Sequence, residues 1–326
     1  MKKGVILLLV LTIIFALLAD AGNKESIVIC ASTEQFRNDA LQEQLAERFP
    51  EKNIIVMYMP TGKAAAKIFA EGTDSEVDIL VGMETGYLNK IENSLADISG
   101  VSELLYVDGV TVADNRNHWV TWERQAGAIV LNTEILEKYG LEKPQTLSDL
   151  LKPEYKGLVA MPDPKSSGTG YFFYKNWVNT MGEEDTLAFV DQLYGNLKQF
   201  TESGSGPIKM LKQGEIAIGL ALTFQAVSEI NDGQPFEIIF PETGSPYSLT
   251  GTAVIDGHQH KDGVMEVYDF IINEFLVYDK EYFSPEKIYE GQVNAIPNYP
   301  QDIIYADMTG IQDDEEKDRL LALWKY

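Results

Sequence analysis

The chain has 326 residues, of which 45% are apolar and 23% charged, as in an ordinary globular protein. Its formal net charge of −24 argues against a nucleic-acid binder, which needs a basic surface, and against electrostatic docking on anionic lipid. The single cysteine, Cys30, excludes an intramolecular disulfide, and its apolar neighbours favour a buried core residue.

The first residues predict a secretory signal peptide at residues 1–21. Two lysines precede an apolar run at residues 5–18, and the Ala-Asp-Ala sequence at residues 19–21 has the form of a cleavage site. The apolar run is shorter than the ~20 residues that a membrane-spanning helix needs. We therefore expect an exported protein, in the periplasm or on the outer face of the cytoplasmic membrane.

After this segment, short apolar runs alternate with amphipathic stretches. Residues 26–31, 53–59 and 77–81 predict strands, and residues 34–49 and 64–71 between them predict helices. This βαβαβ order is typical of a sheet with helices on both faces.

The rest of the chain continues this alternation. Further predicted strands are 110–112, 119–122, 126–131, 157–161, 216–222, 236–240 and 250–255. Further predicted helices are 134–139, one from 146, 170–181, 186–197, 208–212 and 264–275.

The length of the mature chain suggests two domains, yet no linker divides it. We expect two lobes with the chain crossing between them near residues 119–124 and 245–252. Lobe I would comprise residues 26–118 plus 250–300, and lobe II residues 119–249 plus 301–326.

Four loops that precede predicted helices are rich in hydroxyl and glycine residues. In open α/β sheets, ligands lie beyond the carboxyl ends of strands, at helix N-termini, where free N–H groups can hold an anion. Each loop is also compatible with a plain helix cap or a turn. The loops contain Ser32-Thr33, Thr61-Gly62-Lys63, Ser166-Ser167-Gly168-Thr169-Gly170-Tyr171 and Ser203-Gly204-Ser205-Gly206.

With these loops in this order, the chain resembles substrate-binding proteins of bacterial ABC importers. The branch it resembles includes ferric-iron, thiamine, phosphonate and sugar-phosphate binders, and further matches are residues 213–219 and 241–244. The resemblance extends to about residue 255 and depends on the ordered set, because no single motif is specific.

The resemblance implies an α/β, two-lobed type II periplasmic-binding fold, each lobe a central mixed sheet flanked by helices. The lobes would close over a small molecule and then dock on ABC permease subunits. We expect a monomer that needs no cofactor or metal and is not an enzyme. The sequence contains no Gly-x-Ser-x-Gly or His-Glu-x-x-His motif, which argues against an exported hydrolase. An exported hydrolase and a ligand-sensing module are the alternatives of another class.

The residues favour an oxyanion ligand over iron. The iron branch carries a tyrosine pair after the strand equivalent to residues 216–222, because Fe(III) prefers anionic oxygen ligands, but here Thr223-Phe224-Gln225 follows. A ferric-iron or thiamine binder remains the alternative.

We expect a small phosphorylated or phosphonate solute, held by hydroxyl groups and helix N-termini. The residues expected to hold the anion are Ser32, Thr33, Ser167 and Thr169, with Thr61, Gly62, Lys63, Ser166 and Gly168 beside them. The residues expected to face the organic part are Trp122, Glu123, Thr223, Gln225 and Glu242.

Overall fold

The computed structural model describes residues 26–107, 109–110 and 117–326. The predicted signal peptide at residues 1–21 lies outside the described residues, as does most of the strand predicted at 110–112. No helix within the described residues is long and apolar enough to span a membrane.

The first part of the chain folds as parallel strands joined by helices, which confirms the predicted βαβαβ order. The strands lie in the order β2-β1-β3, and every residue of β3 is buried, as its continuous apolar sequence requires. The elements are β1 (Ile27–Ala31), α2 (Gln35–Arg48), β2 (Ile54–Tyr58), α3 (Thr61–Glu71), β3 (Ile79–Glu84) and α4 (Thr85–Lys90).

The middle of the chain builds a second group of strands, with β5 between β7 and β6 and parallel to both. Its elements are β4 (Trp119–Asn132), α5 (Thr133–Tyr139), β5 (Val159–Pro162), α6 (Gly168–Met181), α7 (Glu183–Tyr194), β6 (Leu197–Thr201), α8 (Gly206–Lys212), β7 (Ile218–Leu222), α9 (Thr223–Asn231) and β8 (Phe236–Ile239). The elements that follow are β9 (Tyr247–Val254), α10 (Val264–Phe270), α11 (Leu276–Tyr282) and α12 (Asp314–Leu323).

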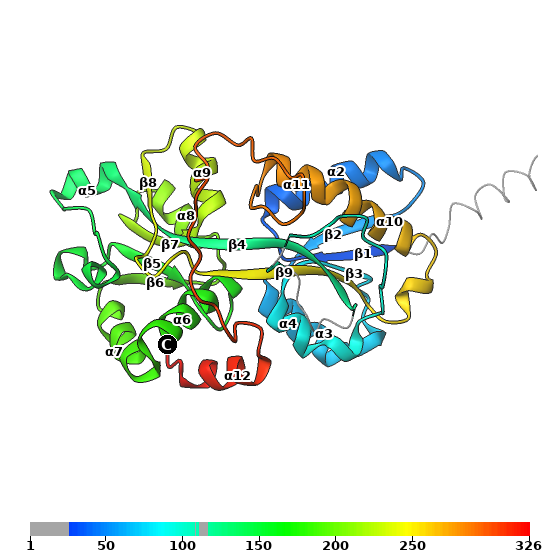
Figure 1. The fold of residues 1–326 in the computed structure, drawn as a ribbon, viewed down its shortest axis with the longest axis horizontal. Helices are drawn as coiled ribbons and strands as arrows, with labels where there is room; N and C mark the ends of the chain where they lie inside the picture. The colour runs from blue at the N-terminus through cyan, green and yellow to red at the C-terminus, as the bar shows by residue number, and fades with distance from the viewer. Residues whose placement is uncertain (1–25, 108, 111–116) are drawn as a thin grey trace, which may run out of the picture.

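Two long antiparallel strands join the two groups. The first part of β4 pairs with β9, and its second part pairs with β7 and β8, while β9 also pairs with β3. Figure 1 shows β4 and β9 running side by side along the middle of the molecule from one half to the other. We call the half around β1–β3 lobe I and the half around β5–β7 lobe II; their exact boundaries stay a prediction.

A third crossing lies in the segment after α11. Ile288 packs in a core cluster with lobe I residues, whereas Tyr299 and Trp324 pack in the cluster of lobe II. The chain therefore passes from lobe I to lobe II between Ile288 and Tyr299, and α12 packs on lobe II.

Three elements differ from the sequence-based expectation. The helix predicted at 186–197 is α7 followed by the strand β6, because Gly195 ends the helix. The helix α9 was not predicted, because it begins directly after β7 and no turn residues separate the two elements. The acidic run after Gln312 opens α12, with the side chain of Asp313 accepting from Glu316 N, since carboxylates stabilise a helix N-terminus.

Candidate functional site

A cleft of about 540 Å³ lies between the lobes. Lobe I contributes the loops after β1, β2 and β3, lobe II contributes the loops after β5 and β6, and the crossing strands supply the floor. The residues that line it are Ser32, Thr33, Glu34, Gln35, Tyr58, Pro60, Thr61, Lys63, Gly82, Glu84, Gln125, Ser166, Ser167, Gly168, Thr169, Glu202, Ser203, Gly204, Ser205, Lys209, Leu222 and Thr250.

Three helices, α2, α3 and α6, begin at this cleft. The first N–H groups of a helix have no partner within it, and they carry the positive end of the helix dipole. At α6 the Ser167 hydroxyl caps Gly170 N, which leaves the N–H groups of Gly168 and Thr169 at the start of the helix. The cleft is therefore lined by backbone donors.

Two glycines are needed to form these helix starts. A Cβ on Gly170 would lie 2.6 Å from the backbone of Asp163, so only glycine lets α6 begin against this loop. Gly82 has a φ of +69°, and a Cβ there would lie 2.5 Å from the Thr33 side chain. Gly82 thereby makes room for Thr33 at the edge of the cleft.

Three of the loop hydroxyl groups that line the cleft donate hydrogen bonds within the protein. Ser32 Oγ donates to Met59 O at 2.9 Å, and Thr33 Oγ1 donates to Asn38 Oδ1 at 2.5 Å. Ser166 Oγ donates to Glu202 O at 2.8 Å. On the cleft floor, Thr250 Oγ1 is buried without a partner among the described residues. In this conformation the loop hydroxyls mainly shape the cleft, and the backbone N–H groups are its more available donors.

Each carboxylate that lines the cleft has a cationic partner. Glu84 pairs with Lys317 of α12, and Glu202 pairs with Lys63 across the lobes. Glu34 Oε2 lies 3.0 Å from Arg37 Nη1. The negative charges of Glu84 and Glu202 are therefore compensated from within the protein, whereas Glu34 shares Arg37 with two buried carboxylates.

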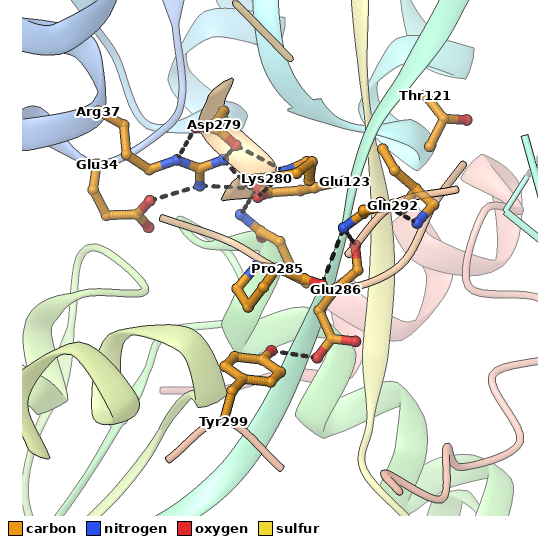
Figure 2. A network of polar contacts seen from close by, with 12 residues as sticks. Glu34, Arg37, Thr121, Glu123, Asp279, Lys280, Pro285, Glu286, Gln292 and Tyr299 are labelled. Atoms are coloured by element: carbon orange, nitrogen blue, oxygen red, sulfur yellow. Dashed lines mark hydrogen bonds and ion pairs between the residues drawn. The ribbon is translucent and has the colours of Figure 1, made fainter. Parts of the chain in front are cut away.

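Behind Glu34 lies a buried network of charges, which Figure 2 shows around the Arg37 guanidinium. Arg37 pairs with Glu123 of β4 at 2.7 Å and with Asp279 of α11 at 2.6 Å, and Lys280 lies 2.8 Å from Asp279. All four of these side chains are at most 1% exposed. The network ties the start of α2 to the crossing strand β4 and to α11.

The buried network shifts the pKa values of two glutamates in opposite directions. Burial raises the pKa of Glu34, and this effect outweighs the opposing attraction of Arg37. Burial also acts to raise the pKa of Glu123, but Arg37 and Lys280 outweigh it and lower this pKa to about 2. Glu123 is therefore an ionised structural group.

Lobe II reaches the same network through α9. Gln225 Nε2 donates to Glu34 Oε1 at 2.7 Å, and the Phe224 ring lies 5.2 Å from the Arg37 guanidinium carbon. Two residues of the Thr223-Phe224-Gln225 segment thus join the lobes. Among the described residues, no group of three His, Cys, Asp or Glu side chains could hold a metal ion.

The structure brings most of the predicted loop residues together at the cleft. Of the predicted ligand contacts, those that line it are Ser32, Thr33, Thr61, Lys63, Ser166, Ser167, Gly168 and Thr169. Gly62 lies beside them, where a Cβ would be 3.3 Å from Tyr87 Oη and 3.4 Å from Lys165 O. Whether these residues touch a ligand stays a prediction.

The residues predicted to face the organic part do not line the cleft. Trp122 stacks on Phe275 in the lobe I core, with their ring centroids 6.0 Å apart. Glu123 and Gln225 belong to the network around Arg37, Thr223 is fully buried at the start of α9, and Glu242 is exposed in a loop.

Other residues of the cleft escaped the sequence analysis. Glu34 directly follows Ser32-Thr33, whereas residues 203–205 belong to the fourth of the predicted hydroxyl- and glycine-rich loops. Tyr58, Glu84 and Gln125 lie on strands, where no local motif marks them.

Comparison with known proteins identifies the family. A family model described as "Bacterial extracellular solute-binding protein" matches residues 83–276. The chain belongs to this family. The predicted class, an extracellular binder of a small solute, is therefore confirmed.

Solved structures show the fold of this solute-binding protein. The periplasmic binding protein P5PA superposes with a TM-score of 0.80 at 21% identity, over 92% of this chain and 98% of the other. The periplasmic binding protein AfuA from Actinobacillus pleuropneumoniae, with exogenous fructose-6-phosphate bound, superposes with a TM-score of 0.79 at 22% identity, over 93% of this chain and 98% of AfuA. A periplasmic thiamin binding protein gives 0.78 at 14% identity over 92% and 95%. The expected type II periplasmic-binding fold is confirmed.

A relative of the solute-binding protein occurs in Haemophilus influenzae. This uncharacterized protein is 32% identical over 145 residues, which are 44% of this chain and 42% of the relative. The match thus spans less than half of the relative's length.

Proposed function

We propose that this protein captures a small phosphorylated or phosphonate solute outside the cytoplasmic membrane and delivers it, unchanged, to the permease of an ABC importer. The observation that carries the proposal is the meeting of α2, α3 and α6 at a cleft whose carboxylates are all held in ion pairs. Backbone donors at helix N-termini suit an oxyanion.

The paired carboxylates matter because an unpaired one would repel an anionic ligand. A unit charge 4 Å from another still feels roughly 4 kcal/mol of repulsion at a dielectric typical of a protein surface. Lys63 and Lys317 remove most of this repulsion at Glu202 and Glu84, while Glu34 shares Arg37 with Glu123 and Asp279. The bound fructose-6-phosphate of AfuA, a protein of the same fold, is in line with such a ligand.

An iron ligand is less compatible with the cleft. Phe224 and Gln225 contact Arg37 and Glu34 and leave no phenolate at this point of lobe II. Tyr58 is the tyrosine that lines the cleft, and burial raises its pKa, which disfavours a phenolate ligand for Fe(III).

The test is isothermal titration of the mature protein with a panel of sugar phosphates, phosphonates, thiamine and Fe(III). We expect binding of at least one phosphorylated or phosphonate compound, weakened about tenfold by Thr169→Val, which removes a hydroxyl from the start of α6. The control is Thr73→Val, at an exposed site outside the cleft.

Two outcomes would contradict the proposal. The first is binding of thiamine or Fe(III) together with no detectable binding of the phosphorylated and phosphonate compounds. The second is release of inorganic phosphate from a bound ester over time, which would indicate a hydrolase.

A further inference from the structure

Five charged side chains line the cleft, and four of them are held in ion pairs. Glu34 pairs with Arg37, Glu84 with Lys317, and Lys63 with Glu202. The fifth, Lys209, has no ion-pair partner among the described residues.

Lys63, the cation that the sequence suggested as a ligand contact, has a different environment. Its ammonium group meets the Glu202 carboxylate of the opposite lobe, and the two side chains are 60% and 64% exposed. This position at the rim suits a contact that forms when the lobes close. The positive charge of Lys63 is already compensated by Glu202.

Lys209 belongs to α8, directly after the loop at residues 203–205 that lines the cleft. This loop packs on the start of α6, because a Cβ on Gly204 would lie 2.3 Å from Thr169 Oγ1. Lys209 thus lines the same cleft as the helix start that would receive the anion. A cation there can add to the field of the helix N-terminus.

We propose that Lys209 is the residue that compensates the charge of the bound solute and selects for an anion. This inference rests on the proposed function, whose ligand class it makes more specific. Lys63 and Glu202 then act in closing the lobes, while Lys209 acts on the ligand itself.

The chain offers a matched control on the same helix. Lys212 pairs with Glu229 at 2.9 Å and does not line the cleft. Lys209→Met and Lys212→Met remove the same charge from α8, so any effect of net charge alone is equal in the two variants. The variants differ in the position of the lost charge relative to the cleft and in the exposed ion pair with Glu229 that only Lys212→Met removes.

The experiment is isothermal titration of wild type and both variants with fructose 6-phosphate and with inorganic phosphate, at low and at physiological salt. We expect Lys209→Met to weaken binding about tenfold or more, as for loss of a charge-assisted contact, and to make binding less dependent on salt. Lys212→Met should bind as wild type does, and Lys209→Arg should restore most of the affinity.

The possible failures are distinguishable. If wild type binds either anion and Lys209→Met binds it equally well, the role of Lys209 is wrong while the proposed function stands. Equal weakening in both methionine variants also overturns it, since the effect would then come from net charge. If wild type binds neither of these anions but binds thiamine or Fe(III), the proposed function is wrong. The inference about Lys209 is then wrong as well.

Discussion

Arg37 shows how much one buried residue can organise. It is 1% exposed, pairs with Glu123 and Asp279, and faces Phe224 of the opposite lobe. Such a group adds little to stability when compared with an apolar residue, but its partners depend on it completely, because a buried charge without a partner is costly.

Arg37→Met should therefore destabilise the protein strongly. It leaves Glu123 and Asp279 buried without their main partner, and we expect a loss of about 3–5 kcal/mol in the free energy of unfolding, measured by urea titration. Arg319→Met removes a 51% exposed arginine paired with Glu183 and should cost far less, because an exposed ion pair is screened by solvent. Similar losses in the two variants would contradict the structural role of the network.

The helix α12 is the element that most directly joins the lobes beside the cleft. Its Leu320, and Trp324 directly after the helix, are buried in the lobe II core. Lys317 pairs with Glu84 of lobe I and lies 3.7 Å from the ring centroid of Tyr87 and 4.4 Å from that of Tyr171. These rings come from opposite lobes, so the ammonium group is enclosed only when the lobes are closed.

Further contacts extend this junction. Asn89 donates to Gln312 O, and Lys90 pairs with Asp318 at 2.7 Å. Burial lowers the pKa of Lys317, against the influence of Glu84, as expected for an ammonium group removed from water. In Figure 1, α12 is the red helix at the edge of the molecule.

Lys317→Met should shift the ligand-free protein toward the open form. The measurement is the distance between spin labels at Glu47→Cys in lobe I and Glu184→Cys in lobe II, with the buried Cys30 left unlabelled. We expect a longer mean distance than in the parent. Lys325→Met removes a lysine that pairs with Asp191 within lobe II and should leave the distance unchanged. An unchanged distance in Lys317→Met would mean that α12 does not hold the lobes together.

At the scale of the whole molecule, β4 and β9 connect the lobes as a paired ribbon. Closure brings the start of α6 against lobe I, where a Cβ on Gly168 would lie 3.2 Å from the Glu84 side chain. This position tolerates almost no added volume, because both sides of the contact are packed.

Gly168→Leu should act as a wedge that prevents full closure. With fructose 6-phosphate added, wild type should show a smaller radius of gyration in small-angle X-ray scattering, whereas the variant should stay as extended as ligand-free wild type. Ala188→Leu adds similar volume at an exposed site of α7 and should close normally. Compaction of Gly168→Leu equal to that of wild type would contradict the tight contact.

Local sequence signals predicted the loops of the cleft but not its charges. Ser32-Thr33 follows β1 of lobe I and Ser166–Thr169 follow β5 of lobe II, and the two loops meet because the carboxyl ends of these strands face each other across the cleft. The pair of Glu84 with Lys317 joins residues 233 positions apart, and that of Arg37 with Asp279 joins residues 242 apart. Such pairs depend on tertiary packing, which no short pattern records.

The misplaced prediction for Trp122 and Glu123 has a local cause. The register of β4 against β9 shifts between Thr121 and Glu123, as a β-bulge does. One extra residue reverses which face of a sheet the following side chains occupy. Trp122 and Glu123 lie at this irregularity, and both side chains are buried rather than at the cleft.

The position of α12 in the chain has a consequence for how the cleft is assembled. Synthesis proceeds from the N-terminus, so Glu84 and the loops that surround it leave the ribosome well before Lys317. Until α12 arrives, Glu84 lacks the partner that it has in the folded protein. Folding of lobe I alone therefore cannot bring the binding site to its final electrostatic state, which requires residues as far along the chain as Lys317.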